Sequence, residues 1–122
     1  MASDVFVRWK TTKRPTREEA EKVIQDFLGE VATEIEWKKD RFFVTLIGKW
    51  SHPLVRVVEP AMQDVIKNMY PKEEGWEGRY LEVWLGDDSL DVMTRRQDEF
   101  THACQDGLAA VFARFWEGEI EK

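Results

Sequence analysis

The chain has 122 residues and a formal net charge of −6. Hydrophobic residues make up 43% of it and charged residues 34%, which are ordinary proportions for a globular protein. From this length we expect a single domain, residues 1–122. It contains no apolar run long enough to cross a bilayer and no basic start followed by an apolar stretch, so we expect neither a membrane span nor a signal peptide. The acidic excess disfavours nucleic acid as a partner, because phosphate contacts require positive charge.

Residues 4–10 alternate between apolar and polar side chains, with Val5, Val7 and Trp9 on one side, which predicts a β-strand. Residues 11–15 are polar and end in a proline, so we expect a loop there. Five basic residues and no acidic one fall between positions 5 and 17, namely Arg8, Lys10, Lys13, Arg14 and Arg17. We interpret this basic cluster as a solvated strand end and loop, and contact with RNA or DNA as the less favoured alternative.

A helix is predicted next, because Thr16 and Glu19 have the spacing of a capping box, in which each side chain binds a backbone N–H of the other residue. Apolar residues then recur at helical spacing up to Val31. Residues 35–37 and 41–49 follow as a hairpin that turns at residues 38–40. Both faces of its second strand are apolar, with Phe43 and Ile47 on the second face. That face must therefore be covered, form a cavity or form an interface.

Residues 54–58 suit a short strand or the start of a helix, and we leave both open. Pro60 suits the start of a second helix. Residues 71–78 have the composition of a linker. A second hairpin, residues 79–94, turns at the sequence Gly-Asp-Asp-Ser.

The last helix is predicted to begin at Thr94, with a second capping box, and to keep its apolar period to Trp116. Small residues recur along it, so its backbone can approach the sheet, the first helix or a second subunit closely. These small residues are Ala103, Gly107, Ala110 and Ala113. Cys104 falls on the apolar stripe, where we expect an inert buried thiol.

The order of elements is β-α-β-β-(β)-α-β-β-α, which predicts an α+β fold. We expect a single layer of mainly antiparallel sheet with the Thr16 and Thr94 helices packed on one face. In its element order, this duplicated β-α-β-β pattern resembles bacterial regulator domains of the gyrase-inhibitor type. That resemblance implies a cleft, acidic and aromatic, that holds cationic amphiphiles.

The strand of residues 79–85 places Tyr80, Glu82 and Trp84 on the face opposite Leu81, Val83 and Leu85. Across the turn, Asp91 and Met93 share this second face if the register allows. Aromatic rings beside a carboxylate suit an organic cation, or an arginine or lysine of a partner protein. The alternative is an outer face whose aromatic residues only stabilise the sheet by cross-strand pairing.

Asp98, His102 and Asp106 recur every four residues on one side of the last helix. A solvated helix face is favoured over a metal site or a proton shuttle, because no second histidine lies nearby in sequence. We therefore predict no catalytic residue, no metal ligand and no cofactor. The single cysteine excludes an intramolecular disulfide and favours a soluble protein of the reducing cytoplasm.

The favoured function is a small, non-enzymatic interaction module. It would be a homodimer, or would bind another protein, through sheet surface that the helices leave uncovered. The alternative is a binding protein for a small apolar or cationic ligand. Its candidate residues, which serve as interface or ligand-binding residues, are Glu36, Trp37, Tyr80, Glu82 and Trp84. An enzyme is less favoured, because no nucleophile and base can be paired.

Overall fold

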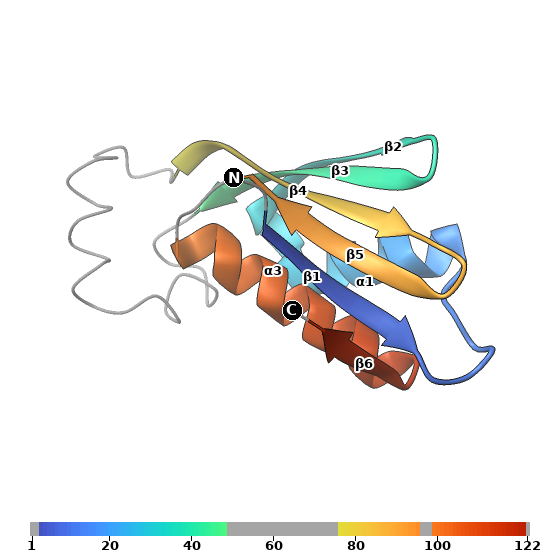
Figure 1. Cartoon of the computed structure of the whole chain (residues 1–122). Helices are drawn as coiled ribbons and strands as arrows, with labels where there is room; N and C mark the ends of the chain where they lie inside the picture. The colour runs from blue at the N-terminus through green and yellow to red at the C-terminus, as the bar shows by residue number, and fades with distance from the viewer. Residues whose placement is uncertain (1–2, 49–75, 96–98, 122) are drawn as a thin grey trace.

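The computed structural model describes residues 3–48, 76–95 and 99–121 (Figure 1). Its elements are β1 (Ser3–Trp9), α1 (Arg17–Leu28), the 3-10 turn η1 (Gly29–Val31), β2 (Ala32–Lys38), β3 (Arg41–Gly48), β4 (Trp76–Leu85), β5 (Ser89–Thr94), α3 (Glu99–Phe115) and β6 (Gly118–Glu121). The interpretations of residues 54–58, of a helix at Pro60, of linker residues 71–75 and of Asp98 fall outside the described residues. The linker prediction is wrong for residues 76–78, which belong to β4.

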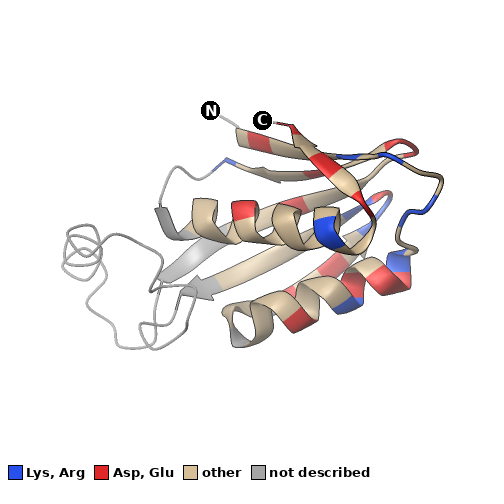
Figure 2. Ribbon diagram, turned by 90° about the horizontal axis from the view of Figure 1, so that it is seen from below, with Lys and Arg blue, Asp and Glu red and all other residues tan. Residues whose placement is uncertain are grey.

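The six described strands form one open sheet in the order β2-β3-β4-β5-β1-β6, and every neighbouring pair is antiparallel. Helices α1 and α3 lie side by side and pack on the same face of this sheet (Figures 1 and 2). The predicted fold class, an α+β single layer with two helices on one face, is therefore confirmed. No helix among the described residues is long and apolar enough to cross a membrane.

The predicted capping box at the start of α1 is present. The backbone N–H of Glu19 donates to the Thr16 hydroxyl at 3.1 Å, and that of Thr16 donates to the Glu19 carboxylate at 3.0 Å. The helix ends at Leu28, three residues before the end of its apolar stripe at Val31. The reason is Gly29, whose φ of 54° is a conformation that glycine adopts at little cost.

The hydrophobic core lies between the helices and the sheet. Alternate residues of the strands point into it, and one stripe of each helix covers them. To this core the sheet contributes Val5, Val7, Phe42, Val44, Leu46, Leu81, Val83, Leu90 and Val92, the turn η1 contributes Val31, and the helices contribute Ala20, Ile24, Leu28, Cys104, Leu108, Ala109 and Phe112. Cys104 is thus a buried thiol, as predicted.

Two residues of α3 fix its position on the sheet and beside α1. The buried side chain of Gln105 donates to the carbonyl oxygens of Ser3 and Val92, each at 2.8 Å, and so links the helix to β1 and β5. A Cβ on Gly107 would lie 2.6 Å from the Phe27 ring of α1. The close neighbour predicted for the small residues is therefore α1 at this position.

The predicted start of the last helix at Thr94 is wrong. Thr94 is the last residue of β5, and its hydroxyl donates to the Tyr80 carbonyl oxygen at 3.0 Å. Within the described part of the chain, α3 begins at Glu99. Threonine suits a strand as well as an N-cap, so the local spacing alone could not separate the two roles.

The last strand, β6, was not predicted from the sequence. It pairs with β1 in the register Val7↔Ile120 and Trp9↔Gly118. A Cβ on Gly118 would lie 2.5 Å from Val7 Cγ1 and 3.2 Å from the Trp9 ring, so glycine permits this close approach. Four residues with only one fully apolar side chain carry too little periodicity to indicate a strand.

Candidate functional site

The face of the sheet opposite α1 and α3 is the candidate site, and we call it the uncovered face. No described helix lies on it, and alternation along each strand together with the register defines its members. They are Glu34, Glu36 and Lys38 of β2; Arg41, Phe43 and Thr45 of β3; Tyr80, Glu82 and Trp84 of β4; Asp91 and Met93 of β5; Asp4, Phe6 and Arg8 of β1; and Glu119 and Glu121 of β6.

The strand register aligns these side chains in rows across the sheet. Arg41 lies opposite Trp84, Trp84 opposite Asp91, and Asp91 opposite Phe6. We call these four residues, with Lys38 opposite Arg41, the Trp84 row. It places a carboxyl group directly between two aromatic residues.

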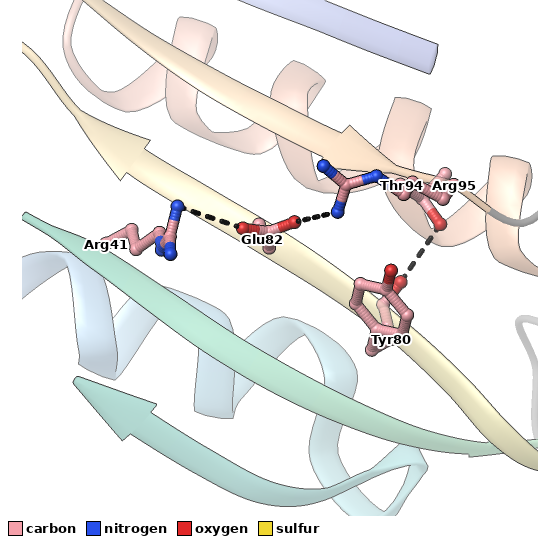
Figure 3. A network of polar contacts seen from close by, with 5 residues as sticks. All are labelled: Arg41, Tyr80, Glu82, Thr94 and Arg95. Carbon is pink, nitrogen blue, oxygen red and sulfur yellow. Dashed lines mark hydrogen bonds and ion pairs between the residues drawn. The ribbon is translucent and has the colours of Figure 1, made fainter. Parts of the chain in front are cut away.

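Glu82 lies at the centre of the uncovered face, yet it is only 2% exposed. Its two carboxylate oxygens are 3.4 Å from the guanidinium of Arg41 on one side and 3.4 Å from that of Arg95 on the other (Figure 3). A buried carboxylate is costly unless it is paired, and here two cations pair it. The Tyr80 side chain, followed by the charge of Glu82, raises the pKa of Arg95 above its ordinary value, so Arg95 stays charged.

Arg41 is held by rings as well as by charge. Its guanidinium carbon lies 4.1 Å from the centre of the Trp84 ring and 4.7 Å from that of Phe43. Both rings attract the cation and limit its motion. The uncovered face therefore contains one complete site for a guanidinium group, and Arg41 of the same chain fills it.

A second carboxyl group, Asp91, is held differently. Partial burial raises the pKa of Asp91 from 3.8 to about 7, and a hydrogen bond with Asp4 and the negative charges of Asp4 and Glu82 add to the effect. Below about pH 7, Asp91 thus keeps a proton beside a second carboxyl group, that of Asp4 on the adjacent strand. Three buried polar atoms of the Trp84 row have no hydrogen-bond partner: Arg41 Nε, Trp84 Nε1 and Asp91 Oδ1.

Because the pKa of Asp91 is raised in the folded chain, we expect the free energy of unfolding to depend on pH. Its pKa is about 7 in the folded chain and near 3.9 when unfolded, so between these values the folded state binds more protons. The free energy of unfolding should therefore fall as the pH rises from 4 to 7. Urea unfolding across this range should show less of this decline in Asp91→Asn than in the unmodified chain. The exposed Asp88 provides the control, since Asp88→Asn should keep the decline; equal profiles for all three proteins would contradict the assignment.

The structure brings together four of the five candidate residues named from the sequence. Glu36, Tyr80, Glu82 and Trp84 all belong to the uncovered face, and Asp91 and Met93 join them through the register of β4 and β5. Trp37 does not, because neighbouring residues of a strand point to opposite faces. Its ring packs at 4.7 Å from that of Phe42 on the helix side, and the guanidinium of Arg17 lies 4.9 Å from it.

Four residues that lie beside Glu82 or Asp91 were not found from the sequence: Asp4, Phe6, Arg41 and Arg95. The alternation in residues 4–10 did place Asp4 and Phe6 on a face of their own. What no local pattern could show is that β1 lies beside β5, which puts Asp4 close to Asp91.

The sequence patterns also single out one side of the last helix and the basic cluster of residues 8–17. Among the residues that the structure describes, no group of three or more His, Cys, Asp or Glu side chains is placed to hold a metal ion. Three members of the basic cluster bind groups of the chain itself. Arg8 pairs with Glu121 at 3.0 Å, Arg14 binds Asp87 through both its carbonyl and its carboxylate, and Arg17 contacts Trp37.

The fold thus defines an α+β protein with an open antiparallel sheet and a polar, aromatic face. No family model, no curated protein and no solved structure matches the chain.

Proposed function

We propose that this chain, as a single cytoplasmic domain, is a non-enzymatic interaction module that forms a homodimer through the uncovered face. The observation that carries the proposal is the state of Glu82: it is 2% exposed on a face that no described element covers, and both its oxygens are paired. Arginine, tryptophan, tyrosine and phenylalanine surround it, and aromatic residues and arginine are enriched at protein interfaces.

Covering this face costs less than covering an ordinary charged surface. An ion pair that must be stripped of water on docking loses hydration energy, but Glu82 has already lost its contact with water. Arg41 already contacts two rings and pairs with Glu82, so little side-chain entropy remains to be lost. Apolar area is still available on the face, since Phe6 is 38% exposed.

A second copy suits this face because of how charge is arranged along the Trp84 row. Lys38 and Arg41 lie on the β2 side of Trp84, whereas Asp91 and, beyond Phe6, Glu121 lie on the β6 side. A two-fold axis along β4 would place the basic side of one copy over the acidic side of the other. Such an interface is self-complementary, as two-fold dimers require.

The test compares two exposed phenylalanines on opposite sides of the molecule. We expect sedimentation velocity across the micromolar range to show a monomer–dimer equilibrium. Phe6→Ser, on the uncovered face, should raise the dissociation constant about tenfold or more. Phe115→Ser, at a residue 63% exposed on α3, should leave it unchanged. A monomer at every concentration, or equal effects of the two substitutions, would contradict the proposal.

A small-ligand binding protein is the second candidate function. The unpartnered Trp84 Nε1 donor and Asp91 Oδ1 acceptor support it, because both belong to the same row beside exposed aromatic surface. Thermal unfolding with a panel of organic cations and apolar compounds tests this reading. A bound ligand at about 100 times its dissociation constant stabilises the fold by about 2.7 kcal/mol. No shift with any compound would count against a small ligand.

A further inference from the structure

The uncovered face contains two arrangements of the same type, side by side. In the first, Phe43 and Trp84 hold the guanidinium of Arg41 against the carboxylate of Glu82. In the second, Trp84 and Phe6 lie on either side of Asp91, directly opposite it on the neighbouring strands. Trp84 belongs to both arrangements.

The second arrangement differs from the first in what neutralises its charge. Arg41 and Arg95 neutralise Glu82. Asp91 instead lies diagonally across from a second acid, Asp4, and its burial and its interaction with Asp4 raise its pKa to about 7. Its Oδ1 atom is buried without a hydrogen-bond partner. Two acids that share a proton become a pair of carboxylates when a cation replaces that proton.

We propose that Asp91, which lies between Trp84 and Phe6, and Asp4, diagonally across from it on β1, form a site for the guanidinium or ammonium group of a protein that docks on the uncovered face. The proposal rests on the proposed function, with a second copy as the docking protein. In that dimer the cation is the ammonium group of the partner's Lys38, because Arg41 already binds Glu82 and two rings of its own chain. The source is a protein side chain rather than a free compound because the site is open, with Phe6 38% exposed, and an open site binds tightly only when a larger interface holds its ligand in place.

The charged groups that face Asp91 set the sign of the pH effect. They are Asp4 on β1, Glu82 on β4 and Arg95 directly after β5. Arg95 interacts with Asp4 as well as with Glu82, but its ion pair, like that of Arg41, is made with Glu82, and Arg8 is paired with Glu121. Docking of a cation therefore releases the proton of Asp91. Dimerisation should tighten on the order of tenfold per pH unit between pH 6 and 7 for each proton released. An interface that buried the two acids without a cation would weaken over the same range.

The first arm of the test measures whether the two acids bind a free cation without a docking protein. We expect Nα-acetyl-arginine amide, at tens of millimolar, to lower the midpoint of the Asp91 carboxyl titration, observed by carbon NMR. An opposite charge close to a carboxyl lowers its midpoint by about one unit or more when the site is filled. The neutral Nα-acetyl-citrulline amide, which has nearly the same shape, should leave the midpoint unchanged. Equal effects of the two compounds, or no effect of either, would overturn the proposal.

The second arm measures the dimer dissociation constant at pH 6, 7 and 8. We expect it to fall with rising pH in the unmodified chain, and the dependence to be lost in Asp91→Asn. A constant that rises with pH would overturn the cation site while leaving the homodimer standing. The chain could instead stay monomeric at every pH while the arginine compound, and not the citrulline compound, shifts the midpoint of the Asp91 titration. That result would keep the cation site but rule out a second copy as the source of the cation. If the free arginine compound bound with a micromolar dissociation constant, the site would not need a larger interface, and a protein side chain would be ruled out as the source of the cation.

Discussion

Replacing Phe112 with alanine is expected to lower the free energy of unfolding by about 3–5 kcal/mol. Phe112 is fully buried on the sheet side of α3, and its ring lies 5.8 Å from that of Trp116. The substitution removes apolar contacts and leaves a cavity that the rigid sheet below cannot close. Urea unfolding, followed by tryptophan fluorescence, measures the change.

The same helix provides the matched control. Phe115 is one turn further along α3 and 63% exposed. Phe115→Ala therefore removes the same atoms from the surface and leaves no enclosed cavity. We expect a change within about 0.5 kcal/mol. If both alanine variants lost similar stability, the packing of α3 on the sheet would not be as described.

Replacing Arg41 with methionine is expected to destabilise the chain by about 2–3 kcal/mol. Removing one partner of a buried ion pair costs about 3–5 kcal/mol, because the other charge is left buried, and here Arg95 remains beside Glu82 to reduce that cost. Methionine keeps an unbranched apolar side chain in place of the arginine stem and removes only the guanidinium, so most of the loss comes from charge.

The double variant Arg41→Met with Glu82→Met separates charge from packing. It removes the buried carboxylate together with its partner, and buried ion pairs replaced by apolar residues of similar size are often no less stable. We expect the double variant to recover most of the stability lost in Arg41→Met. Urea unfolding at pH 7 measures the difference. A double variant as unstable as the sum of the two single variants would show that Glu82 and Arg41 do not act as a pair.

The sequence predicted the parts of the fold that depend on local pattern. The capping box at Thr16, the turn of the β2–β3 hairpin and the inward face of β4 each follow from a spacing of a few residues, and each is confirmed. At Thr94 the local pattern fits either a strand or a helix N-cap, and tertiary contacts decide between the two. The Thr94 hydroxyl donates to the Tyr80 carbonyl oxygen, which keeps Thr94 in the strand.

The candidate site was predicted only in part, because it is assembled across strands. Alternation placed Tyr80, Glu82 and Trp84 on one face, but it could not show that two arginines already neutralise Glu82. It also could not show that Asp4 and Asp91 meet, since β1 and β5 are distant in sequence. Trp37 was grouped with Glu82 from residue type alone, and strand geometry places it on the other face.

The position of β1 between β5 and β6 has a consequence for how the chain folds. Arg8 of β1 binds Glu121 of β6, 113 positions later, and β5 is almost as distant. Contacts this far apart in sequence require large loops to close first, which slows folding. During synthesis on a ribosome, β2 and β3 can pair as soon as they emerge, whereas β1 must wait for strands that are made last. Until then β1 exposes Val5 and Val7, so the nascent chain is most prone to aggregate in this interval.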